Sequence, residues 1–121
     1  MDVEPILIKL DRSIELVKSL IDKILENNMR KNEKIEDVWK IASELEYISS
    51  LLSIIFELGD YYPDFNKSED MNITELMINI KESLNDINEM IRKDQKEGYK
   101  IIRSAIHNTR ILQNKVELFK K

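Results

Sequence analysis

Residues 33–58, EKIEDVWKIASELEYISSLLSIIFEL, decide the fold class of this chain. Apolar residues recur along them in steps of three and four, from Val38 to Ile55, which is the period of a helix buried along one side. At about 100° per residue, nearly the opposite side of the same helix carries a second apolar series: Tyr47, Leu51, Ile54 and Leu58. The segment is therefore expected to form a helix that is apolar on two sides.

Three further segments have the same heptad spacing of apolar residues. Pro5 suits the first turn of the first one, and Asn72 followed by Glu75 resembles a capping box at the start of the third. We therefore expect an all-α fold, an antiparallel four-helix bundle with the chain 1–121 as a single domain. The expected helices span about 4–27, 33–58, 73–94 and 98–120.

The expected helix ends depend on few punctuating residues. Gly59 is a natural left-handed stop for the second helix, and Pro63 forbids a helix through the loop 59–71. The stripe of the fourth helix is one residue out of phase with that of the third, which favours a turn near Gly98. The alternative is a fold of three helices, in which the last two are continuous and bent near Gly98.

Composition limits the function classes. With 35% charged and 42% hydrophobic residues, the chain is neither a disordered nor a membrane protein. Its longest apolar stretch, residues 48–56, is far short of the roughly 20 residues that span a bilayer. The absence of cysteine excludes disulfides and thiolate metal sites, and the acidic N-terminus is unlike a signal peptide. We expect a cytoplasmic location.

Charge is segregated along the chain. Residues 92–121 carry a net charge of +6, whereas residues 1–91 carry −10. Helical spacing places five basic residues on one face of the last helix, and we call them the basic stripe: Lys96, Lys100, Arg103, His107 and Arg110.

Three interpretations of the basic stripe are open. The first is a solvated face, or one that pairs with acidic residues of a neighbouring helix, with the acidic line of the first helix as a partner across an oligomer. That line consists of Glu4, Asp11, Glu15, Asp22 and Glu26. The second is binding to nucleic acid, against which the acidic net charge of −4 stands. The third is an acidic protein partner.

The second apolar series of residues 33–58 indicates an interface, because a helix that is apolar nearly all round is buried on both sides. Aromatic residues that follow the helix in sequence extend this expected interface, since aromatic residues are enriched in interface cores. The expected interface residues are Tyr47, Leu51, Ile54, Leu58, Tyr61, Tyr62 and Phe65. The alternative is that the aromatic loop folds back and covers this face within one subunit.

Residues 103–108, RSAIHN, resemble the Arg–x(4–6)–His signature of the HEPN helical-bundle ribonucleases. The resemblance implies that the Arg103 and His107 side chains act on an RNA phosphate across a dimer interface. Only three residues separate them here, which departs from the family pattern. No Gly-rich phosphate loop and no Glu-x-x-His pair occurs, so the sequence predicts no cofactor, no metal and no catalytic residue.

Together these features predict a non-enzymatic protein–protein interaction module. It is expected to self-associate, with a dimer as the preferred state, and to act as an adaptor or a small subunit of an assembly. The alternative is a nucleic-acid-associated accessory protein that uses the basic stripe, with a HEPN-like ribonuclease as a remote variant.

Overall fold

The computed structural model describes residues 3–26, 31–59, 61 and 71–117, with the backbone alone at 31–33 and 117. All regular structure in this part of the chain is helical, which confirms the all-α class. The described residues form five helices rather than the expected four. They are α1 (Glu4–Leu25), α2 (Lys31–Ile55), α3 (Ile73–Ser83), α4 (Ile87–Lys93) and α5 (Gln95–Glu117).

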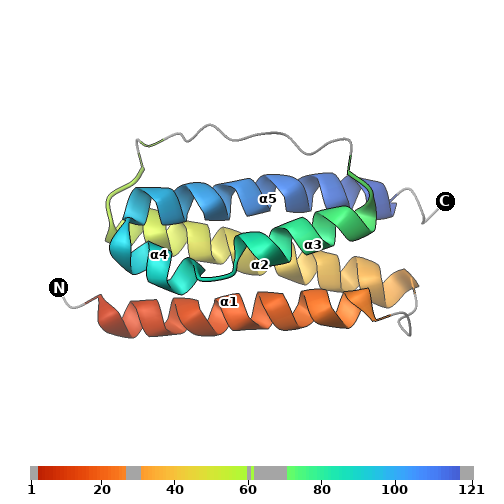
Figure 1. The fold of residues 1–121 in the computed structure, drawn as a ribbon, viewed down its shortest axis with the longest axis horizontal. Helices are drawn as coiled ribbons and strands as arrows, with labels where there is room; N and C mark the ends of the chain where they lie inside the picture. Colours follow the sequence, from red (N-terminus) through yellow and green to blue (C-terminus); the bar gives the residue numbers. More distant parts are fainter. Residues whose placement is uncertain (1–2, 27–30, 60, 62–70, 118–121) are drawn as a thin grey trace.

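The helices lie side by side along the long axis of the molecule, with α3 and α4 following one another (Figure 1). Helix α5 packs against α2, α3 and α4, and α1 packs against α2 and α3. Figure 1 shows that α1 and α5 run in one direction, whereas α2, α3 and α4 run in the other. Each of these contacting pairs is therefore antiparallel. The end of α2 and the start of α3 lie at opposite ends of the molecule (Figure 1).

The apolar stripes read from the sequence form the core. Six apolar residues of α1 recur in steps of three and four, and all are buried: Leu7, Leu10, Ile14, Val17, Ile21 and Ile24. In the corresponding apolar series of the other helices, only Ile55 and Ile73 among the described residues are half-buried. The buried side chains of all five helices belong to one cluster. Burial of one such side chain stabilises the fold by about 1.5–3 kcal/mol, so this cluster is the main source of stability.

The expected third helix, 73–94, is wrong as a single element, because it is interrupted between α3 and α4. Asp86 adopts a left-handed backbone conformation with φ of 60°, which an α-helix does not contain. Asp and Asn tolerate this conformation better than other non-glycine residues. Leu84, Ile87 and Ile91 are nevertheless all buried. The apolar period continues across the break, so periodicity gave no signal of it.

The junction before the last helix lies at Asp94, four residues ahead of the expected turn at Gly98. Asp94 has extended backbone angles, and its Oδ1 accepts a hydrogen bond from the backbone N–H of Glu97 at 3.1 Å, as an N-cap does. Gly98 lies inside α5, where an added Cβ would come within 2.9 Å of Ile91 Cγ1 and 3.0 Å of its Cα. The alternative with the last two helices continuous is therefore wrong. Gly98 permits close contact between α4 and α5 rather than ending a helix.

Gly59 is not the left-handed stop of α2. That conformation belongs to Glu57, with φ of 55°, directly after the helix and Phe56. The backbone N–H of Leu58 then donates to the carbonyl of Ser53 at 2.9 Å, which is the long hydrogen bond of a Schellman motif. This turn directs Leu58 into the core, where it is 5% exposed. The capping box at the start of α3 is confirmed, since Asn72 Oδ1 accepts from the N–H of Glu75 at 2.8 Å.

Candidate interaction surface

The outward face of α2 carries three large, exposed, apolar or aromatic side chains. Ile54 is 72% exposed, Trp39 is 51% exposed and Tyr47 is 47% exposed. Between them lie the small exposed residues Ser43 and Ser50. All five positions fall within about 80° of one another around the helix at 100° per residue. We call this set, Trp39, Ser43, Tyr47, Ser50 and Ile54, the α2 stripe.

The α2 stripe borders two hollows along the seam between α2 and α5. One, of ≈ 450 Å³, is lined by Trp39, Ser43 and Glu46 of α2 and by Arg110 of α5, among others. The other, of ≈ 310 Å³, is lined by residues of the C-terminal part of α2, including Ser50 and Ile54, and by residues at the start of α5. Small α2 residues line both hollows, so the surface is concave at these two places along the seam.

Glu46 lines the first hollow and pairs with two residues of the basic stripe. Arg110 Nη2 lies 2.7 Å from Glu46 Oε1, and Arg103 Nη1 lies 3.7 Å from Glu46 Oε2. Arg103 also donates a hydrogen bond to the hydroxyl of the buried Ser49 at 3.4 Å. Pairing with the neighbouring helix α2, as the first interpretation of the basic stripe allows, is therefore observed for both arginines.

The other members of the basic stripe differ in exposure, and Lys96 is exposed. Lys96 lies over the ring of Tyr61, with 5.5 Å between Nζ and the ring centroid. Lys100 and His107 are half-buried. The basic stripe is therefore partly exposed and partly covered by neighbouring residues.

The acidic line of α1 has partners within the same chain. Arg92 of α4 lies 3.1 Å from both Glu4 and Asp11, and its hydrogen bonds, first to Asp11 and then to Glu4, raise the pKa of the guanidinium. Lys81 of α3 forms an ion pair with Asp22. Three of these five acids, Glu4, Asp11 and Asp22, therefore pair with residues of α3 and α4 and not with the basic stripe.

The predicted interface residues separate into two groups. Tyr47 and Ile54 are exposed as expected, and Leu51 is half-buried against the core. Leu58 is buried and Tyr61 is half-buried, with its ring 6.1 Å from that of Tyr99. Leu58 and Tyr61 therefore pack within the same chain. The predicted interface residues Tyr62 and Phe65 lie outside the described residues.

Sequence reasoning missed Trp39, Ser43 and Ser50. The predicted interface was defined by apolar residues with spacings of four and three from Tyr47 onward, and serine is not apolar. The available signal was the combination of the only tryptophan of the chain with serines at four and eleven residues beyond it, since this spacing keeps all three on one helix face.

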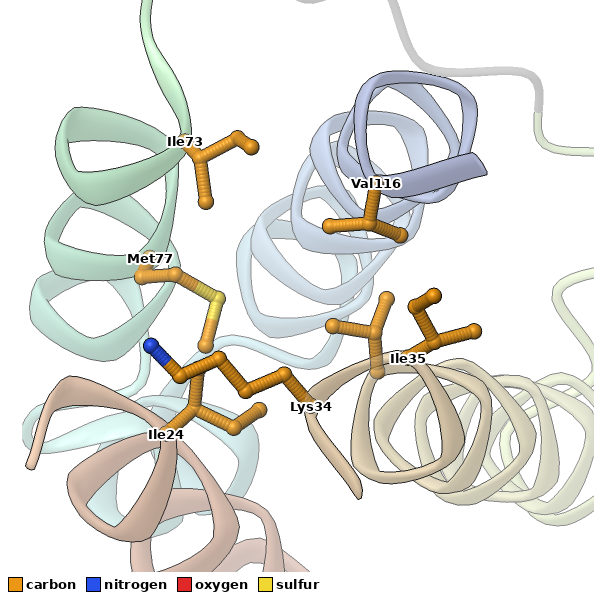
Figure 2. A pocket seen from close by; sticks show the side chains of 7 residues that line it. Ile24, Lys34, Ile35, Ile73, Met77 and Val116 are labelled. Atoms are coloured by element: carbon orange, nitrogen blue, oxygen red, sulfur yellow. The ribbon is translucent and has the colours of Figure 1, made fainter. Parts of the chain in front are cut away.

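A third hollow lies at the end of the molecule where α1 and α5 end and α2 and α3 begin (Figure 1). Figure 2 shows this cavity of ≈ 220 Å³, with Ile24, Ile35, Met77 and Val116 directed toward one another from four helices. Lys34 extends from α2 across the space between α1 and α3 (Figure 2). It is the one polar side chain among the lining residues. Ligand sites combine an apolar wall with several convergent polar groups, which this lining does not supply.

No group of three or more His, Asp or Glu side chains in the described ranges is placed to hold a metal ion. Arg103, the arginine of the HEPN-like segment, is engaged with Glu46 and Ser49 of α2. None of the helices in the described part of the chain combines the length and apolar composition needed to cross a membrane.

Comparison with protein-family models, curated proteins and solved structures finds no match to this chain. Function is therefore inferred from the surface of the molecule itself.

Proposed function

We propose that this protein is a non-enzymatic interaction module that self-associates, most simply as a homodimer, through the outward face of α2. In this proposal it acts in the cytoplasm as an adaptor or a small subunit of a larger assembly. The observation that carries the proposal is the α2 stripe, which exposes Trp39, Tyr47 and Ile54 on one face of one helix. Exposed apolar residues clustered on one face are typical of interaction sites, whereas scattered ones are ordinary.

We further propose that the fold is an antiparallel four-helix bundle, in which α3 and α4 together occupy the third position. Two observations support this proposal. The contacts α1–α2, α2–α5, α5–α3 and α3–α1 form a closed ring, and the helices in each pair run in opposite directions. In such a bundle no helix is central, so an outward apolar face is left for another chain to cover.

The competing nucleic-acid function has less support from the geometry. Phosphate binding requires cationic groups that are free to approach the backbone of the nucleic acid. Arg103 and Arg110 are both paired with Glu46, and Lys96 is placed over Tyr61. An acidic protein partner would meet the same competition from Glu46. The apolar α2 stripe requires no rearrangement of these pairs, and for this reason we favour self-association.

The test is the molar mass in solution, by light scattering after size-exclusion chromatography at micromolar concentrations. We expect a species of twice the 14.4 kDa chain mass, and we expect Ile54→Glu to convert it to a folded monomer. A glutamate at this exposed position costs the monomer little but places an unpaired charge in an apolar contact. Leu51→Glu is less informative, because Leu51 also packs against the core.

Leu16→Glu is the matched control. Leu16 lies on α1 and is 46% exposed, so it introduces the same charge at an exposed leucine away from the α2 stripe. We expect this variant to remain a dimer. A monomer for the unaltered chain at every concentration would overturn the proposal, as would a dimer that persists in Ile54→Glu.

A further inference from the structure

The α2 stripe has nearly the same character when read in either direction along the helix. Its midpoint lies between Glu46 and Tyr47. At equal distances from that point stand the two large residues, Trp39 and Ile54, and the two small ones, Ser43 and Ser50. A two-fold axis through this midpoint would therefore superpose large positions on large and small positions on small. An isologous contact between identical subunits requires this kind of self-complementary surface.

We propose that two copies of the chain dock through antiparallel α2 helices, around a two-fold axis that passes between Glu46 and Tyr47. Trp39 then faces Ile54 of the partner subunit, and Ser43 faces Ser50 of the partner subunit. This inference rests on the proposed self-association and adds the occupant of the surface, its register and its direction.

The two hollows of the α2–α5 seam fit this arrangement. The ≈ 450 Å³ hollow lies beside Trp39 and Ser43, and the ≈ 310 Å³ hollow lies beside Ser50 and Ile54. The two-fold axis places Ile54 of the partner subunit opposite Trp39, beside the first hollow. At each end of the contact an isoleucine thus lies against a concave part of the other subunit, as in the packing of ridges into grooves between helices.

Electrostatics favours the antiparallel direction over a parallel one. A parallel two-fold pairing would align Glu46 with Glu46 of the partner subunit and place like charges opposite each other. The antiparallel pairing aligns Glu46 with Tyr47 of the partner subunit instead. It also opposes the helix macrodipoles, which is the favourable arrangement. The two arginine pairs of Glu46 within each subunit, at 2.7 and 3.7 Å, remain intact.

Side-chain volume gives the same preference. In a parallel pair the two Trp39 side chains would meet at one end of the contact and the two Ile54 side chains at the other, which would force the helix axes apart at the tryptophan end. The antiparallel register pairs one tryptophan with one isoleucine at both ends. The separation of the axes is then uniform along α2, which close packing of two helices requires.

Cysteine cross-linking tests the register, because the natural chain contains no cysteine. Ser43→Cys and Ser50→Cys are prepared separately, mixed in equal amounts, refolded together from urea and oxidised. We expect the mixture to form disulfide-linked dimers at least about tenfold faster than either variant alone, since only the mixed dimer brings a cysteine pair together at high effective concentration. Ser19→Cys, at an exposed serine of α1, replaces one partner in the control mixture and is expected not to accelerate cross-linking.

The outcomes separate this inference from the proposal on which it rests. Rapid cross-linking of Ser43→Cys with itself would show a parallel pair and overturn the inference alone. So would a dimer that Ile54→Glu dissociates but in which neither the mixture nor the single variants cross-link. A monomer by light scattering at every concentration would overturn the proposed function and the inference together.

Discussion

At the scale of single residues, a buried polar contact links two helices, the hydrogen bond between Asn108 of α5 and Asn79 of α3. Asn108 Nδ2 donates to Asn79 Oδ1 at 2.9 Å, and Asn108 is only 2% exposed. Among the described residues Asn108 Oδ1 has no hydrogen-bond partner. The side chain of Asn108 has only this one hydrogen bond to offset the loss of hydration of its amide. Its removal is costly, because an unpaired buried polar group lowers the free energy of unfolding.

We therefore expect Asn79→Ala to lower the free energy of unfolding by about 1–3 kcal/mol, since it leaves both polar atoms of Asn108 unpaired in the core. Asn108→Leu added to Asn79→Ala should recover most of this loss, because the buried amide is then removed. Urea unfolding followed by circular dichroism measures all three free energies. A double variant no more stable than Asn79→Ala would show that the unpaired amide of Asn108 is not the cause of the loss.

At the scale of helices, Gly98 shows that a glycine within a helix can serve packing rather than termination. Helix α5 passes so close to α4 at this point that an added Cβ would come within 3.0 Å of the backbone of Ile91. Alanine is the better helix former by about 1 kcal/mol, which by itself would predict stabilisation. The contact with the Ile91 backbone decides the opposite, because backbone atoms cannot move aside as a flexible side chain can.

We expect Gly98→Ala to destabilise the protein by about 1–3 kcal/mol, the usual cost of overpacking, in spite of its higher helix propensity. Gly59→Ala is the matched control. Nothing lies within 4 Å of its added Cβ, and Gly59 does not have a positive φ. Its effect should be under about 0.5 kcal/mol. Thermal unfolding of both variants compares them, and a Gly98→Ala protein as stable as the unaltered chain would contradict the close approach of α4 and α5.

At the scale of the whole molecule, charge and apolar surface have different roles. Part of the segregated charge is paired within the fold, through Arg92 with the acids of α1 and through Glu46 with the arginines of α5. The apolar α2 stripe is left at the surface. Self-association through this stripe is therefore expected to depend on apolar burial and not on ionic contacts.

The single tryptophan reports on this directly, because Trp39 is part of the α2 stripe. We expect its fluorescence emission to shift to shorter wavelength as the protein concentration passes through the dissociation constant. The midpoint should change by less than about threefold between 0.1 and 1 M salt, since salt screens exposed charges but does not weaken apolar contact. A mass that doubles without any change in emission would place the contact on another face.

The sequence by itself determined the helical class and the inward face of each helix. The three-and-four spacing of apolar residues marks the buried side whatever the neighbouring helix is, as the complete burial of the α1 stripe from Leu7 to Ile24 shows. The register change before the last helix was also visible. The position of the junction at Asp94 was not visible, because several neighbouring polar residues could each end a helix. Packing of α5 against α4 decides which of them does.

Only the tertiary structure decided the break at Asp86 and the surface left exposed on α2. The break keeps the apolar period intact, so the spacing of apolar residues carries no trace of it. Ile54 and Leu58 belong to the same apolar series in the sequence. The left-handed Glu57 turns Leu58 inward, whereas Ile54 remains 72% exposed. Which apolar residues stay at the surface depends on where neighbouring helices lie, and that is fixed by contacts between distant parts of the chain.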